Sequence, residues 1–244
     1  MTDEDKATPP TDSLPEEPGK REPAINVPLI VLAAILACAS IHLVRIYVLT
    51  QEQDLALLVR AAFVPIRYTG GYDLDVYAFT SPVTYSLLHG SVTHLAVNMV
   101  WLAAFGSPLA NRMGATRFLL FWIVSSVAAA GLHFAIYPYG QSPLVGASGA
   151  ISAMMGAAAR FAFRIDRSAG QPTFAGPVLP VAYVLRLRGV IIFLAVWMVI
   201  NLVTGVYSLT PGVADQIAWE AHIGGFLVGF LGLSLFDRAS RDDR

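Results

Sequence analysis

The sequence predicts an all-α, polytopic membrane protein with six membrane-spanning helices. Three observations predict this fold class: 55% of the 244 residues are hydrophobic, only 14% are charged, and apolar segments recur along the chain. A soluble domain carries roughly 25% charged residues, and a helix needs about 20 apolar residues to cross a bilayer. The formal net charge of −1 and the absence of a basic helix argue against nucleic acid as a partner.

The first 26 residues are predicted to form a disordered tail before the membrane domain. They contain five prolines, charges of both signs and almost no large apolar side chains. Such a composition cannot bury enough apolar surface to fold, and it lacks the basic start and apolar core of a signal peptide. Residues 237–244 are predicted to form a short tail at the other end, which leaves residues 27–236 as the membrane domain.

Six apolar segments make up this domain, each close to the length of a membrane span. They are Val27–Leu49, Leu87–Ala110, Phe118–Tyr137, Ser148–Ile165, Val190–Ser208 and Trp219–Phe236. The fourth and sixth are short, which suits helices that begin below the membrane surface. Residues 50–86 are predicted to be either an amphipathic stretch in the interface or a loop, and residues 166–188 to be a linker.

The basic residues orient the six spans. Of the 16 Lys and Arg residues, thirteen would share one side with both termini, and only Arg45, Arg60 and Arg67 would lie on the other. The positive-inside rule therefore predicts cytoplasmic termini, in keeping with an even number of spans. The lack of an organelle-targeting segment favours the inner membrane of a prokaryotic cell.

Ser148 is the first candidate for chemistry, because it stands between two glycines where a polar loop enters an apolar segment. The small residues Gly146 and Gly149 would let another helix or a substrate backbone approach the hydroxyl closely. The amide groups of a first helical turn could also donate to a developing negative charge. The alternative interpretation is a helix-packing face with Ser148 as an ordinary N-cap.

His222 is the candidate base for Ser148. A serine hydroxyl needs an adjacent acceptor for its proton, and neutral imidazole fills that role at physiological pH. Gly225 and Gly229 would share one helix face and allow a close helix–helix approach. The matching small residues in the fourth segment are Gly149, Ala153 and Gly156. The alternative is a histidine that only stabilises the contact with a neighbouring helix.

His94 and Asn98 are four residues apart and are predicted to share one face of the second helix, with His89 at its mouth. Their side chains could donate to a tetrahedral oxyanion together with the Ser148 amide. They could instead tie helices together. The three histidines His89, His94 and His222 could also bind zinc, but no His-Glu-x-x-His motif is present and we expect no carboxylate within the buried segments. No cofactor or metal is therefore predicted.

The depth of these residues decides between the interpretations. If helices alternate in direction, the second, fourth and sixth all begin on the same side of the membrane. His94, Ser148 and His222 would then lie at a similar depth, near the outer surface. Because polar residues inside a membrane are costly, their coincidence favours a functional site.

The chain resembles the rhomboid intramembrane serine proteases over about residues 27–236. The residues that carry the resemblance are the histidine and asparagine run His89–Asn98, the motif Gly146–Gly149, and Ala221–Gly225 with Gly229. The resemblance implies a six-helix bundle and a catalytic dyad without an acidic third member. It also implies single-pass transmembrane proteins as substrates, cut near their external ends.

The same resemblance implies a role for each matching residue. Ser148 would be the nucleophile and His222 the base, while His94, Asn98 and the Ser148 amide would form the oxyanion hole. The segment Arg188–Trp197 would belong to a lateral gate for substrate, with Trp197 lining it. Two further histidines and three further tryptophans are predicted to pack or to anchor the helices; they are His42, His133, Trp101, Trp122 and Trp219.

Three positions depart from the family pattern. A Trp-Arg pair in the first external loop is replaced by Phe79-Thr80, and a glutamate after the second helix is replaced near Ala110-Asn111. Ser152 stands where an aromatic residue often packs on the catalytic histidine. The resemblance therefore leaves open what orients His222 in this chain.

The sequence argues against two functions that rival proteolysis. A catalytically silent relative would bind and escort transmembrane helices, but such proteins lose the serine or the histidine and this chain keeps both. A transporter or channel would need polar residues through the full depth, whereas the residues after Ser152 read Ala153-Met-Met-Gly-Ala-Ala158. Membrane lipid is the expected surroundings, and the sequence does not indicate an oligomeric state.

Overall fold

The computed structural model describes residues 27–168, 170–207 and 218–237. The predicted tails lie outside them, apart from Asp237. The helices that match the predicted segments are α1 (Leu29–Tyr47), α4 (Val92–Trp101), α6 (Ala115–Ile136), α7 (Ser148–Arg160), α9 (Arg188–Tyr207) and α10 (Trp219–Gly232). After α4, a π-helical turn at Leu102–Gly106 leads into α5 (Ser107–Met113). Each of the six predicted apolar segments therefore contains a helix, as the sequence predicts.

Four of the described helical stretches are long and apolar enough to cross a membrane. They are Leu29–Tyr47, Val92–Met113, Ala115–Ile136 and Arg188–Gly205. The stretch Trp219–Leu235 is apolar but shorter, and α7 has 13 residues. The chain is therefore a multi-pass membrane protein in which length and composition identify four candidate spans among the described residues.

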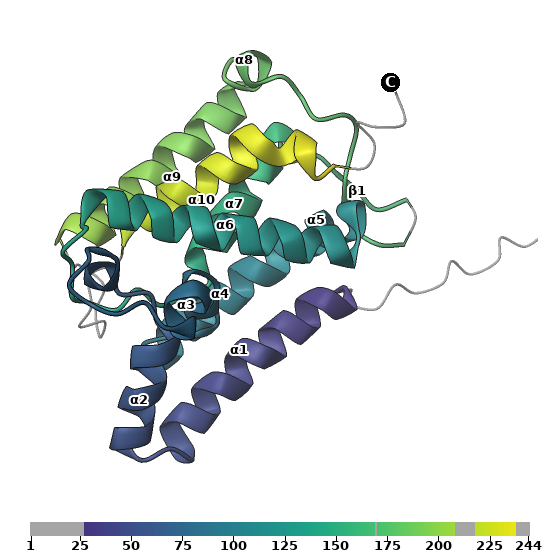
Figure 1. Cartoon of the computed structure of the whole chain (residues 1–244). Helices are drawn as coiled ribbons and strands as arrows, with labels where there is room; N and C mark the ends of the chain where they lie inside the picture. Colours follow the sequence, from purple (N-terminus) through teal and green to yellow (C-terminus); the bar gives the residue numbers. More distant parts are fainter. Residues whose placement is uncertain (1–26, 169, 208–217, 238–244) are drawn as a thin grey trace, which may run out of the picture.

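Helix α7 lies at the centre of the bundle (Figure 1). Every residue from Gly149 to Arg160 is buried, although most of these side chains are as small as alanine. Small residues let neighbouring backbones approach closely, so a short helix can be surrounded on all sides. The central helix ends at Arg160, five residues before the predicted end, because Ala162 and Phe163 take up positive φ angles of 51° and 55°.

Helices α7 and α10 run parallel and touch through their backbones. A Cβ atom placed on Gly225 would lie 1.9 Å from the Gly149 carbonyl oxygen, and one on Gly229 would lie 1.7 Å from the Ala153 carbonyl oxygen. The residue numbers at the contacts therefore increase in the same direction along both helices, as they do in a parallel pair. The predicted pairing of small-residue faces is present.

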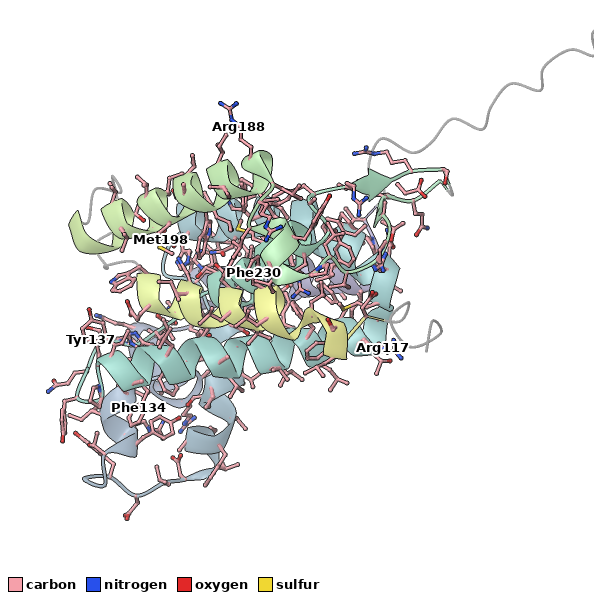
Figure 2. All side chains as sticks on the ribbon, turned by 90° about the horizontal axis from the view of Figure 1, so that it is seen from above. Arg117, Phe134, Tyr137, Arg188, Met198 and Phe230 are labelled. Carbon is pink, nitrogen blue, oxygen red and sulfur yellow. The ribbon has the colours of Figure 1, made fainter. Side chains whose placement is uncertain are left out.

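Helix α10 lies between α9 and α6, as Figure 2 shows. Helix α6 runs antiparallel to α10, because a Cβ on Gly224 would meet Ala128 and Ala129 while His133 contacts Glu220. Helices α4, α7 and α10 thus begin at the same end of the bundle, where α1, α6 and α9 end. We call this end, with His94, Ser148 and His222, the polar end.

The connecting segments are more structured than predicted. Residues 50–86 contain two helices, α2 (Gln51–Ala61) and α3 (Val76–Thr84), separated by a 3-10 turn at Pro65–Tyr68 and followed by another at Tyr85–Leu87. The region after α7 holds a short antiparallel pair, β1 (Ile165–Asp166) with β2 (Thr173–Phe174), and the one-turn helix α8 (Val181–Val184); only Ile165 of these residues lies outside the predicted linker.

An ion pair closes the bundle at the end opposite the polar end. Arg112 binds Asp237 through two hydrogen bonds of 2.8 Å and donates a third, of 2.7 Å, to the Phe174 carbonyl. Its guanidinium also lies over the Phe161 ring, 4.4 Å from the centroid. Because the Asp237 side chain is only 2% exposed, this bidentate pair fixes the segment that follows α10 against α5 and β2.

Candidate active site

The loop before α7 holds Ser148 in place at the polar end. Gly146 has φ +122°, a conformation that favours glycine. A Cβ atom at this position would lie 2.8 Å from Nε2 of His94 and 3.6 Å from Oγ of Ser148. The imidazole of His94 and the hydroxyl of Ser148 therefore flank one point on the loop. Both side chains are partly buried.

Hydrogen bonds from neighbouring segments fix this loop. The Gly146 amide donates to the Tyr85 carbonyl at 3.0 Å, and Leu144 forms a two-way backbone bridge with Phe63. The buried Tyr85 hydroxyl donates to the Ser126 carbonyl in α6 at 2.9 Å. The loop that carries Ser148 is thus connected to α6 and to the segment between α2 and α3, and its conformation does not depend on α7 alone.

Helix α4 carries two of the predicted oxyanion donors, His94 in its first turn and Asn98 one turn later. Ser91 caps the helix by accepting from the His94 amide at 3.1 Å. The buried Asn98 donates one Nδ2 hydrogen to the His94 carbonyl at 2.9 Å. Because an amide nitrogen carries two hydrogens, Asn98 retains a second donor.

His222 lies in the first turn of α10, at the end of the helix that contacts α7 beside Ser148. The backbone contact between Gly149 and Gly225 lies one residue after Ser148 and one turn after His222. A Cβ on Gly149 would also lie 3.6 Å from the Ala221 carbonyl oxygen. The helices of the candidate nucleophile and base are therefore in direct contact beside these two residues.

Asn201 is a contact of His222 that the sequence analysis missed. Its Oδ1 lies 2.5 Å from Nδ1 of His222, and its Nδ2 donates to the Trp197 carbonyl at 2.8 Å. Asn201 is 5% exposed and belongs to α9. The available signal was an amide side chain inside an apolar run, which is a functional candidate by default in a membrane protein.

The expectation that no carboxylate is buried was wrong. Glu220 is 2% exposed and contacts Nδ1 of His133 at 2.5 Å. His133 was predicted to be a packing residue, and the structure gives it this hydrogen bond between α6 and α10. A histidine partner lowers the cost of burying a carboxylate, which is why Glu220 can occupy a predicted span.

His89 does not lie at the mouth of the site, because it is 0% exposed. Its carbonyl accepts from Arg45 at 2.9 Å and contacts Nδ1 of His42 at 3.1 Å, and its ring packs edge-on against His94 at 5.2 Å. His89 therefore connects α1 to the start of α4. Within the described ranges, no group of three His, Cys, Asp or Glu residues is arranged to hold a metal ion.

The comparison with protein families identifies the family. The model of the Rhomboid domain matches residues 78–237, which is more than half of the chain. The chain belongs to the rhomboid family. The match includes every residue of the candidate site, from His94 on α4 to His222 on α10.

Curated relatives of this rhomboid carry the name Rhomboid protease GlpG. The protein of Yersinia pestis (strain Pestoides F) is 24% identical over 205 residues, which are 82% of this chain and 60% of the relative. The protein of Serratia proteamaculans (strain 568) is 26% identical over 149 residues, which are 61% of this chain and 45% of the relative. The chain thus spans less than two thirds of the length of these relatives.

Proposed function

We propose that this rhomboid is an intramembrane serine endopeptidase that cuts transmembrane helices near their outer ends. The observation that carries the proposal is the parallel backbone contact of α7 with α10, which begins beside Ser148 and His222. The names of the curated relatives support the same reaction class. The retained serine and histidine favour this function over a silent helix-binding escort.

In the proposed reaction, Oγ of Ser148 attacks the carbonyl carbon of the scissile peptide bond while Nε2 of His222 takes the hydroxyl proton. The C–N bond then breaks, and His222 returns that proton to the leaving amine. Water subsequently attacks the acyl-enzyme with His222 again as base, which restores Ser148. No metal or cofactor takes part in this scheme.

The oxyanion of each tetrahedral intermediate would be held by the Ser148 amide and by the side chains of His94 and Asn98. This assignment is supported by the position of the His94 ring beside Gly146 and by the second Nδ2 hydrogen of Asn98. Losing one such donor typically costs about 10²–10³ in rate. These donors would thus stabilise the negative charge on the substrate oxygen and lower the energy of the tetrahedral intermediate.

We also propose that all six predicted segments span the membrane, with α7 and α10 beginning below the outer surface. Both termini would be cytoplasmic, in the inner membrane of a prokaryotic cell, because this orientation would put thirteen of the 16 basic residues on the cytoplasmic side. Single-pass substrates would enter past α9. This route is supported by the limited packing of α9, which contacts α10 through the stack of Trp197 on Phe226 at 4.7 Å.

The test is proteolysis of defined substrates in a membrane. The purified chain is reconstituted into proteoliposomes with a library of single-pass helices, and the fragments are identified by mass spectrometry. We expect cuts in the outer halves of some helices, and no cuts with Ser148→Ala. Intact helices that co-purify with the wild-type chain, without any fragment, would contradict the protease and support the escort function.

A further inference from the structure

Asn201 is a polar side chain of α9 that contacts the candidate base. It lies in the second half of the helix, 5% exposed, and its amide group bridges two partners. One partner is the Trp197 carbonyl, one turn earlier on the same helix; the other is Nδ1 of His222 on α10. A side chain buried in this way would be costly unless both ends of its amide were hydrogen-bonded.

The chemistry of the first partner sets the orientation of the amide. A backbone carbonyl only accepts hydrogen bonds, so the NH₂ end of Asn201 must face Trp197. The oxygen end must then face His222. The assignment of oxygen and nitrogen therefore follows from the network and not from the shape of the side chain alone.

The orientation of the amide in turn sets the tautomer of the imidazole. Oδ1 of Asn201 has no hydrogen to give, so Nδ1 of His222 must be the donor at 2.5 Å. In a neutral imidazole only one nitrogen carries hydrogen. Nε2 is then the nitrogen with a free lone pair, as a base for the serine hydroxyl requires.

We infer that Asn201 is the positioning residue of His222: its amide, oriented by the Trp197 carbonyl, holds the imidazole in the Nδ1–H tautomer with Nε2 as proton acceptor. This inference rests on the proposed function, since it gives that tautomer a role in catalysis. It also answers what orients His222 in a chain that carries Ser152 where an aromatic residue is expected. The orienting contact comes from α9 and not from α7.

The contact is held by the packing of α9 on α10. Trp197, whose carbonyl orients the amide, stacks its ring on Phe226 with an interplanar angle of 27°. Phe226 lies one turn after His222 on α10. The same pair of helix turns therefore supplies both the apolar contact and the hydrogen bond, which fixes the distance between Asn201 and His222.

The direct test reads the tautomer of His222 without any substrate. The chain has five histidines, so ¹⁵N-histidine labelling in detergent gives five imidazole spectra, and His222→Gln assigns one of them. At pH 8, where imidazole is neutral, we expect the wild-type protein to show Nδ1–H with unprotonated Nε2. In Asn201→Leu, which fills the same space without polar atoms, we expect a mixture of both tautomers.

The kinetic test separates positioning from stability. We expect Asn201→Leu to lower kcat by about 10²-fold, within the limit of about 10⁴ for a catalytic histidine in the wrong tautomer, with little change in KM. Asn201→Asp keeps an acceptor oxygen for Nδ1 of His222 but loses the donor to the Trp197 carbonyl, so it should recover only part of kcat. Thr204→Ala is the matched control, because the Thr204 hydroxyl donates to backbone carbonyls of α9, those of Ile200 and Asn201, and is not bonded to the side chain of Asn201 or to His222. It should keep the wild-type rate.

The outcomes distinguish this inference from the proposed function. A wild-type His222 in the Nε2–H tautomer, or an Asn201→Leu variant with unchanged tautomer and kcat, would overturn the inference while proteolysis stands. If the wild-type protein shows the Nδ1–H tautomer but cuts no substrate, the contact between Asn201 and His222 stands and the proposed protease function is contradicted. If Asn201→Leu fails to fold, the tautomer of His222 in the wild-type spectrum still tests the inference.

Discussion

Replacing Gly225 by alanine is expected to push α10 away from α7. The added Cβ would lie 1.9 Å from the Gly149 carbonyl oxygen, whereas real Cβ atoms essentially never come closer than 3.0 Å to a heavy atom. The helices must therefore separate by about 1 Å, because the opposing atoms belong to the backbone and have no alternative rotamer. Such overpacking costs about 1–3 kcal/mol of stability.

The catalytic consequence should be larger than the loss of stability. A displacement of about 1 Å between reacting groups can lower a rate about 10²-fold, and Gly225 lies one turn from His222. The rate of Ser148 labelling by a fluorophosphonate measures this effect, and thermal unfolding in detergent measures stability. We expect the Gly225→Ala variant to label about 10²-fold more slowly.

Gly232→Ala is the matched control in the same helix. A Cβ on Gly232 would have no neighbour within 4 Å, and alanine is the better helix former by about 1 kcal/mol. This variant should label at the wild-type rate and be at least as stable. If Gly225→Ala behaves like Gly232→Ala in both assays, the close backbone contact between α7 and α10 is refuted.

Three further predictions concern the loop, the oxyanion donor and the buried carboxylate. Gly146→Ala combines a disfavoured φ of +122° with a Cβ 2.8 Å from Nε2 of His94; labelling should fall at least about 10²-fold, and a normal rate would exclude this geometry. Asn98→Ala should lower kcat of proteolysis about 10²–10³-fold with unfolding unchanged, and an unchanged kcat would remove Asn98 from the oxyanion hole. His133→Leu leaves Glu220 without its hydrogen-bond partner and should destabilise the fold by about 3–5 kcal/mol, measured by denaturant unfolding. The double variant with Glu220→Leu should recover most of that loss, and a double variant as unstable as the single one would contradict the pairing.

The positions of the helices could be predicted because apolar length and charge determine them locally. Ser148 begins α7 as predicted, since its flanking glycines mark the point where a loop becomes a helix. The small residues of α7 and α10 also predicted the contact between Gly149 and Gly225, because close helix packing in a membrane requires small side chains at such positions.

The contacts of Asn201 and Glu220 could not be predicted because the sequence does not give the rotation of each helix about its axis. A polar residue inside a span indicates that a partner exists but not which neighbouring helix supplies it. The early end of α7 at Arg160 was missed for a related reason. The apolar run continues to Ile165, and only the positive φ of Ala162 and Phe163 reveals the turn.

The most direct measurement of the central claim is covalent labelling by a fluorophosphonate, followed by peptide mapping. The claim is that the Ser148 hydroxyl is activated by the His222 imidazole on the neighbouring helix. We predict one modified residue, Ser148, in the wild-type chain, no adduct with Ser148→Ala, and labelling with His222→Ala that is slower by orders of magnitude although the protein is folded. A folded wild-type chain that is not modified, or a His222→Ala variant that labels at the wild-type rate, would contradict the claim.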